Sequence, residues 1–271
     1  MSLAERWDLN MKISCLQMDM KLGSVDENFK HAKELIRNAA VDNPDVVILP
    51  ETWNTGFFPH ENLYELSCKN GDRVKTEIGG LAKELNVNIV AGSVSNVHDD
   101  RIYNTAFIFN RDGECVAEYD KTHLFTPMGE DEYYKYGESL CTFTLDGIQC
   151  GIIICYDLRF PELVRSLALS GINVLFVVSQ WPKERIFHLH SLLTGRAIEN
   201  QMFVVCCNSC GTAGETIYGG KSAIIDPLGN CVALANEKEE ILVSDCDIQS
   251  AAQTRCRIPV FYDRRPELYK L

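Results

Sequence analysis

The sequence feature that most constrains the fold is the run "DVVILPE" (45–51), in which β-branched and other apolar residues follow one another without polar interruption. Such a run is typical of a strand that is covered on both faces. Apolar runs at 151–155, 173–179 and 202–208 predict further strands, and amphipathic patterns predict helices between the sheet segments. A strand buried on both faces requires a packed layer on each side of its sheet. The predicted helices cover 28–40, 73–85, 161–171 and 184–200.

Predicted hairpins decide how the sheets are arranged. Residues 105–121 form two strands around a turn near Asp112–Gly113, and residues 141–155 form another pair around the two-residue turn Asp146–Gly147. A last hairpin surrounds "DPLGN" (226–230), and "EILVSDCD" (240–247) closes the regular pattern. A single doubly wound sheet would leave these hairpins unexplained, so we expect an α/β fold with two packed sheets and the helices outside.

Two local patterns support this assignment of elements. Ser24 and Glu27 have the spacing of a capping box at the start of the first helix, and Pro161 suits the first turn of a later one. No glycine-rich phosphate-binding pattern follows a predicted strand, which argues against a nucleotide-binding sheet.

Composition narrows the class of protein. The chain has 271 residues, 46% of them hydrophobic, and no linker-like segment, so we expect one domain over 1–271 with a short leader at 1–10. A net charge of −12 argues against a nucleic-acid partner. The apolar runs are too short to cross a membrane, and the first residues lack an apolar signal core. The sequence therefore predicts a cytoplasmic protein.

Twelve cysteines raise an alternative of a different class, a cysteine-rich redox or metal-binding protein. Cys207 and Cys210 form the CxxC pair on which this alternative depends. A zinc site normally needs a second pair of ligands, and none occurs at a suitable spacing. We therefore expect reduced cysteines and no bound metal.

Cys155 lies where an apolar strand ends and a helix begins, in "GIIICYDLRFPEL" (151–163). A thiol on such a turn lies beside unpaired helix N–H groups, which favour the thiolate and can donate to an oxyanion. This is the arrangement of a nucleophile elbow. The alternative is a core cysteine that happens to end a strand, and position alone does not decide between them.

A thiol nucleophile needs a base and an electrostatic partner. Glu51 follows a buried strand, where apolar surroundings would raise the pKa of a carboxylate into the range of a general base. Lys121 follows another predicted strand and could stabilise an oxyanion, although an ordinary surface lysine would also fit. His123, two residues further on, offers a Cys–His dyad instead.

Three separated motifs, "LPETWNTGF" (49–57), "YDKTHLF" (119–125) and "CYDLRFPEL" (155–163), resemble the nitrilase superfamily of carbon–nitrogen hydrolases in order and spacing. The resemblance implies a four-layer αββα sandwich of two mixed β-sheets with helices outside. It also implies homodimers or larger homo-oligomers, with the tail at 254–271 at the subunit interface. Finally, it implies a hydrolase without a cofactor that cleaves small non-peptide amides, nitriles or carbamoyl groups.

Carried over by position, the resemblance assigns the proton acceptor to Glu51, the oxyanion-stabilising charge to Lys121 and the nucleophile to Cys155. The backbone N–H of Tyr156 would be a second donor to the oxyanion.

A supporting glutamate belongs to a segment that "EDEYYKYG" (130–137) fits. This match assigns to Glu130 the orientation of Lys121 and of the substrate amide. Glu132 is a rival, but its spacing to Gly137 is wrong. The family pattern leaves His123 without a catalytic role.

The segments around Trp53, Trp181 and the tail most resemble the ω-amidase branch, whose substrates are 2-oxoglutaramate and 2-oxosuccinamate. The resemblance implies that Trp181, Tyr133 and Tyr156 contact the substrate and that Lys183 or another cation holds its carboxylate. Trp53 could equally be a packing residue. The alternative within the superfamily is an N-carbamoyl amino acid amidohydrolase.

Overall fold

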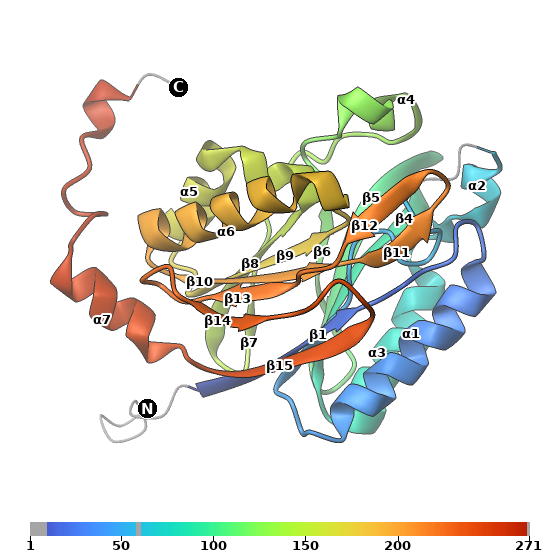
Figure 1. Ribbon diagram of the computed structural model, residues 1–271, viewed down its shortest axis with the longest axis horizontal. Helices are drawn as coiled ribbons and strands as arrows, with labels where there is room; N and C mark the ends of the chain where they lie inside the picture. Colours follow the sequence, from blue (N-terminus) through green and yellow to red (C-terminus); the bar gives the residue numbers. More distant parts are fainter. Residues whose placement is uncertain (1–9, 58–60, 270–271) are drawn as a thin grey trace.

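The computed structural model describes residues 10–57 and 61–269. Two large mixed sheets lie face to face between two pairs of helices (Figure 1). In the first sheet, β2 pairs in parallel with both β1 and β4, while β1–β15, β4–β5 and β5–β6 are antiparallel. Its strands in spatial order are β15 (Glu240–Asp247), β1 (Asn10–Gln17), β2 (Val46–Ile48), β4 (Asn88–His98), β5 (Arg101–Phe109) and β6 (Cys115–Asp120), with β3 (Cys68–Lys69) beside β4.

The second sheet has a parallel centre, because β9 pairs in parallel with both β8 and β10. Hairpins complete it on both sides: β7 pairs with β8, and β13 pairs with β14. Its strands in spatial order are β14 (Cys231–Leu234), β13 (Ala223–Ile225), β10 (Phe203–Asn208), β9 (Val174–Ser179), β8 (Ile148–Ile154) and β7 (Thr142–Leu145).

Three apolar clusters hold the four layers together. One lies between the sheets and contains residues of both, such as Ile48 and Phe176. A second joins the outer face of the first sheet to α1 (Val25–Ala40) and α3 (Asp72–Leu85), and a third joins the second sheet to α5 (Pro161–Leu169) and α6 (Ile186–Asn200). Each sheet is therefore covered on both faces, which confirms the predicted αββα sandwich.

The turn residues explain the hairpin between β7 and β8. Asp146 and Gly147 have φ values of +48° and +81°, as a two-residue primed turn requires. The predicted capping box is wrong, because the Ser24 side chain makes no capping hydrogen bond. The Asn28 side chain instead accepts from Lys21 N at 2.8 Å and donates to Lys21 O at 2.7 Å, which holds the segment before the helix.

Regular structure also continues where the sequence pattern predicted an end. Helix α7 (Gln249–Arg257) follows β15, with only Ala251 and Thr254 buried, so its apolar periodicity is weak. A further hairpin of β11 (Cys210–Ala213) and β12 (Thr216–Gly219) lies beside the second sheet. The short helices α2 (Leu63–Leu66) and α4 (Glu130–Tyr133) complete the described helices besides 3₁₀ turns.

The structure describes the C-terminal segment up to residue 269, whereas at the other end its description begins at residue 10. The predicted leader falls on residues 1–9, outside the described residues, except for Asn10, which begins β1. The C-terminal segment from α7 onward extends away from the sandwich (Figure 1). Over residues 10–57 and 61–269, no helix combines the length and the apolar character needed to cross a membrane.

Candidate active site

Cys155 stands on a strained turn between β8 and the 3₁₀ helix η3 (Cys155–Arg159). Its φ is +47°, a backbone conformation that residues other than glycine rarely adopt. The side chain is only partly exposed, and it directly follows the buried stretch 150–154 of β8. The predicted strand-to-helix position of the thiol is therefore confirmed, and the turn directs Cys155 into the pocket described below.

The buried carboxylate of Asp157 holds this turn in place. It accepts hydrogen bonds from Ile154 N at 3.0 Å, from the Tyr119 hydroxyl at 2.8 Å and from the Thr122 hydroxyl at 3.0 Å. His123 N also donates to it at 2.9 Å. Asp157 thus joins the elbow of the second sheet to the loop after β6 in the first sheet. The sequence analysis gave Asp157 no role.

His123 belongs to the same cluster. Its Nδ1 lies 2.9 Å from Asp157 Oδ1, and its ring stacks on Phe160 with centroids 3.6 Å apart. These contacts hold the imidazole against η3 and give it a carboxylate partner other than the thiol. The geometry gives no support to a Cys–His dyad.

Glu51, Lys121 and Glu130 form a fully buried ionic cluster. The Lys121 ammonium lies 2.8 Å from Glu51 Oε1 and 2.9 Å from each carboxylate oxygen of Glu130. Phe125 N donates to Glu130 Oε2 at 2.6 Å. The rival Glu132 is exposed. Glu51 and Glu130 are 79 positions apart in the sequence, yet both contact Lys121. The candidates that the separate motifs supplied are thus neighbours in space.

Asn104 on β5 and Gln180 at the end of β9 complete the cluster, and the sequence analysis missed both. Asn104 Nδ2 donates to Glu51 at 2.9 Å and to Glu130 at 3.2 Å, so it bridges the two carboxylates. Gln180 N donates to the second oxygen of Glu51 at 3.0 Å. The sequence could have indicated these two residues only by their positions inside a strand or near its end. Many other polar residues of the chain have such positions.

Burial and neighbouring charges set the protonation of the cluster. Burial raises the pKa of Glu51; Lys121 opposes this effect and Glu130 adds to it. Burial alone would lower the pKa of Lys121, but Glu130 and Glu51 raise it well above its usual range. Glu51 is therefore suited to take up a proton, as the sequence predicted, while Lys121 stays cationic.

The expectation that the turn favours the Cys155 thiolate is wrong. Burial, followed by the charge of Glu51, raises the pKa of the thiol well above its usual range, and Lys121 only partly offsets this. The carboxylate of Glu51 and the thiol of Cys155 therefore affect each other's pKa. The resting group is thus a thiol beside a carboxylate that can accept its proton.

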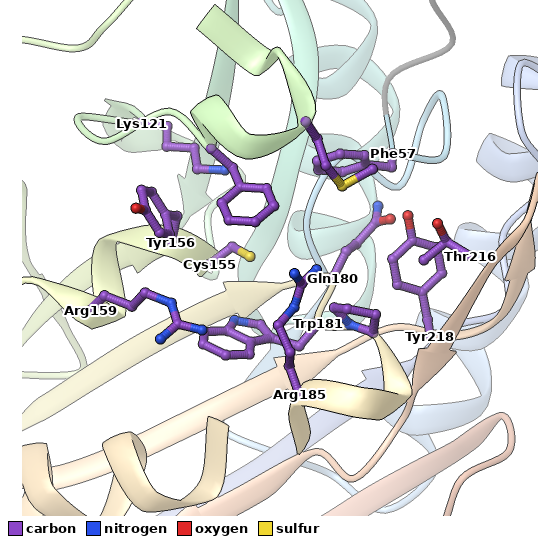
Figure 2. A pocket seen from close by; sticks show the side chains of 13 residues that line it. Phe57, Lys121, Cys155, Tyr156, Arg159, Gln180, Trp181, Arg185, Thr216 and Tyr218 are labelled. Carbon is purple, nitrogen blue, oxygen red and sulfur yellow. The ribbon is translucent and has the colours of Figure 1, made fainter. Parts of the chain in front are cut away.

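Cys155 and Lys121 lie in the wall of a pocket that is open to solvent (Figure 2). Apolar and aromatic side chains form much of its wall, including Tyr156 and Trp181. A mostly apolar wall with polar groups that converge near the sulfur is typical of a site for a small molecule. The other lining residues are Phe57, Phe125, Met128, Arg159, Gln180, Pro182, Arg185, Thr216 and Tyr218.

Comparison with known proteins decides the family. The family model described as "Carbon-nitrogen hydrolase" matches residues 12–256. The chain belongs to the carbon–nitrogen hydrolase family. It is thus an enzyme that hydrolyses carbon–nitrogen bonds other than peptide bonds, as the sequence resemblance implied.

Relatives of this carbon–nitrogen hydrolase agree with the ω-amidase-like resemblance. It is 42% identical to the 2-oxoglutaramate amidase of Bacillus subtilis, over 95% of this chain and 98% of that protein. It is 30% identical to the omega-amidase NIT2 of Pongo abelii, over 93% and 94% of the two chains. The crystal structure of Saccharomyces cerevisiae Nit3, of branch 10 of the nitrilase superfamily, superimposes with a TM-score of 0.87 at 27% identity, covering 94% of this chain and 97% of Nit3.

Three candidate contact residues of this carbon–nitrogen hydrolase lie away from the pocket wall. Tyr133 packs beside Leu63, Leu124 and Tyr134 in a small separate cluster. Trp53 is fully buried, and its Nε1 donates to the Ala91 carbonyl at 2.7 Å, so it is a packing residue.

Lys183, the third of these residues, extends to the surface and pairs with Glu237 at 2.6 Å. The cations at the pocket are Lys121, Arg159 and Arg185. A local sequence pattern cannot distinguish Lys183 from Arg185 on the same turn, because the direction of each side chain depends on how the turn packs.

The CxxC pair of this carbon–nitrogen hydrolase is divided between two buried environments. The Cys207 thiol donates to the carbonyls of Leu16 and Ile48 at 3.3 and 3.4 Å, and the Cys210 thiol donates to Gln17 O at 3.8 Å. All twelve cysteines are free thiols. Among residues 10–57 and 61–269, no group of three or more His, Cys, Asp or Glu side chains is arranged to hold a metal ion.

Proposed function

We propose that this protein is an ω-amidase that hydrolyses the terminal amide of a small 2-oxo dicarboxylic acid, of the 2-oxoglutaramate or 2-oxosuccinamate type, to the acid and ammonia. The observation that carries the proposal is the buried Glu51–Lys121–Glu130 cluster at the Cys155 thiol. The 42% identity with a 2-oxoglutaramate amidase over nearly the full length of both chains supports the substrate class.

In the first step, Glu51 accepts the thiol proton while the sulfur of Cys155 attacks the amide carbon. The raised pKa values of both groups fit a transfer that accompanies attack rather than precedes it. The developing oxyanion is stabilised by the Lys121 ammonium and by the backbone N–H of Tyr156. Glu130 and Asn104 hold Lys121 and Glu51 in place during this change of charge.

In the second step, Glu51 returns the proton to the leaving nitrogen, the carbon–nitrogen bond breaks, and ammonia departs. The acyl group remains on Cys155 as a thioester. Glu51 then takes a proton from water, whose oxygen attacks the thioester carbon. As the carbon–sulfur bond breaks, the proton held by Glu51 passes to the sulfur, which releases the acid and restores the Cys155 thiol. These reaction steps need no cofactor, because the named residues, water and the substrate supply and accept every proton and electron pair.

A panel of substrates tests the proposal. We expect kcat/KM, scored by ammonia release, to be higher for 2-oxoglutaramate and succinamate than for N-carbamoyl amino acids. The alternative activity, an N-carbamoyl amino acid amidohydrolase, would use the same cluster and differ only in the group presented to the sulfur. A clear preference for carbamoyl substrates would replace the proposal with that alternative.

We further propose one domain over 1–271, a cytoplasmic location and a homodimer or larger homo-oligomer with the 254–271 tail at the interface. The support for the interface is the exposure of large apolar side chains along the tail: Ile258 is 58% exposed, and Tyr262 is 89% exposed. Isolated apolar exposure is ordinary, but a row of such residues on a projecting segment is typical of a contact surface.

Charge introduced into the tail tests the interface. We expect Tyr262→Asp to lower the molar mass measured by light scattering, while Leu228→Asp, at a residue 61% exposed on the β13–β14 turn, leaves it unchanged. An unchanged mass in the Tyr262 variant would remove the tail from the proposed interface.

A further inference from the structure

The carboxylate of Glu51 has one acceptor position that its neighbours leave open. Its Oε1 atom accepts from Lys121 at 2.8 Å and from Asn104 at 2.9 Å, whereas its Oε2 atom accepts from Gln180 N at 3.0 Å. A carboxylate oxygen offers about two acceptor positions, so those of Oε1 are filled. No second nitrogen or oxygen donor among the described residues reaches Oε2. Glu51 and the Cys155 thiol affect each other's pKa, so the open position on Oε2 is the one that can take the thiol proton.

The backbone turn that presents Glu51 is strained. Thr52, the next residue, has a φ of +37°, a conformation that is rare for residues other than glycine and rarer still for β-branched ones. Strain of this kind persists only where the surrounding structure holds it in place. One restraint comes from the first sheet, because Ser93 Oγ on β4 accepts from Thr52 N at 2.9 Å. The other restraint comes from the second sheet.

Gln180, directly after β9, supplies this second restraint. Its Nε2 atom donates to the carbonyl oxygen of Glu51 and, at 2.9 Å, to the Thr52 hydroxyl, while its backbone N donates to the Glu51 carboxylate. Gln180 lies in the wall of the same pocket as Cys155 (Figure 2) and is only 3% exposed. Its Oε1 atom has no hydrogen-bond partner in the described part of the chain. A buried acceptor without a partner is unfavourable, so packing alone does not explain an amide here.

We propose that Gln180 is a positioning residue, which holds the strained turn at Thr52 and thereby aims the open acceptor position of Glu51 Oε2 at the Cys155 sulfur. This inference rests on the proposed function and names the oxygen that carries the proton. During attack, the S–H bond of Cys155 breaks and an O–H bond forms at Oε2. The electron pair left on sulfur forms the bond to the amide carbon. If the turn relaxes, Oε2 changes direction and loses the hydrogen bond from Gln180 N.

Gln180→Met tests the proposal, because methionine is also unbranched and removes the Nε2 donor. We expect kcat to fall by roughly 10- to 100-fold, since the proton acceptor is misplaced, while KM stays within about threefold of the parent. A hydrogen bond to a carboxylate favours its ionised form, so the loss of this bond raises the pKa of Glu51. The midpoint at which kcat/KM falls on the acid side should therefore move to higher pH.

Gln201→Met is the matched control. Gln201 is also 3% exposed, its Nε2 atom donates to Ile258 O at 2.8 Å and its Oε1 atom also lacks a partner among the described residues, but it follows α6 outside the pocket wall. We expect both variants to lose thermal stability and only Gln180→Met to shift the midpoint. A parent-like midpoint in Gln180→Met, or an equal shift in Gln201→Met, would overturn the positioning role.

Thr52→Val gives the same test if Gln180→Met does not fold. Valine keeps the branched shape and removes only the hydroxyl that accepts from Gln180, so we expect a smaller shift in the same direction. In that case a parent-like midpoint in Thr52→Val overturns the proposal.

The choice of substrate separates this inference from the proposed function. The pH profiles are measured with the amide or carbamoyl compound that the parent hydrolyses fastest. If this is a carbamoyl compound and the midpoint still moves in Gln180→Met but not in Gln201→Met, the ω-amidase proposal fails and the positioning role stands. If the parent prefers ω-amides and the profiles of parent and Gln180→Met coincide, the ω-amidase proposal stands and the positioning role is overturned.

Discussion

The hydroxyl of Tyr119 donates a hydrogen bond to the buried carboxylate of Asp157 across 2.8 Å. Tyr119 lies on β6 of the first sheet, two residues before Lys121, and Asp157 lies in η3, after β8 of the second sheet and two residues after Cys155. The contact therefore fixes the distance between the proposed charge stabiliser and the proposed nucleophile. A change at this link alters the geometry of the site without removing a reacting group.

Replacing Asp157 by Asn is expected to separate positioning from chemistry. The variant loses a charged acceptor and presents an amide N–H₂ to the donors that bound it. We expect the free energy of unfolding to fall by about 1–3 kcal/mol and kcat to fall by roughly 10²-fold through misplacement of the elbow. Tyr119→Phe, which removes only one of these bonds, should have a smaller effect on both. A normal kcat together with lower stability would show that Asp157 serves the fold alone.

Replacing Lys121 by Met tests oxyanion stabilisation. Loss of one preorganised donor lowers kcat by roughly 10²- to 10³-fold, and we expect at least this loss because Lys121 carries a full charge. Arginine should not restore activity, since its planar fork does not fit a site built around an ammonium. Turnover within threefold of the parent would contradict the role of Lys121.

The same Lys121→Met variant should show a stability that depends on pH. Without the ammonium, nothing of that charge opposes the burial that raises the pKa of Glu51, so this pKa lies further above its value in the unfolded chain and the folded state binds more protons. The stability that depends on Glu51 is then greatest at low pH and is lost as pH rises through the raised pKa of Glu51. Thermal unfolding at pH 5 and pH 8 measures this, with exposed Lys135→Met as the control.

Replacing Glu51 by Gln should change turnover and thiol ionisation in opposite directions. Turnover should fall by at least about 10³-fold, because the proton acceptor is lost. The charge of Glu51 is also the second cause, after burial, of the raised pKa of Cys155. We therefore expect the pH midpoint of Cys155 alkylation, followed by mass spectrometry, to move to lower pH. A midpoint that moves upward would mean that Glu51 promotes ionisation of the resting thiol.

The pH dependence of kcat/KM follows from the cluster. The proton acceptor must be ionised, and burial raises the pKa of Glu51. Activity is therefore lost as pH falls through a midpoint higher than that of an exposed glutamate. Because the pKa of Lys121 is raised well above its usual range, its deprotonation should not lower activity at mildly alkaline pH. If kcat/KM fell on the acid side with a pH midpoint typical of an exposed glutamate, the role of Glu51 would be contradicted.

The sequence by itself determined the order of the main strands and helices, the two-sheet arrangement and the turn that carries Cys155. These follow from short-range patterns: apolar runs, alternation and turn residues such as Asp146–Gly147, which act over a few positions. Motifs around Glu51, Lys121 and Cys155 were sufficient to predict the family. Helix α7 was missed because its buried face is too small to produce a clear apolar period.

Only the tertiary structure decided how the polar groups of the site are paired. Asn104 bonds Glu51 across 53 positions of sequence, and Gln180 bonds it across 129. The tertiary structure also placed Arg185 at the pocket, whereas Lys183 pairs with Glu237 at the surface. It also reversed the expected ionisation of Cys155, because burial and a carboxylate from the other sheet outweigh the N–H groups of the local turn. Partners, burial and charge depend on which chain segments meet at the edges of the two sheets, and no local pattern encodes that meeting.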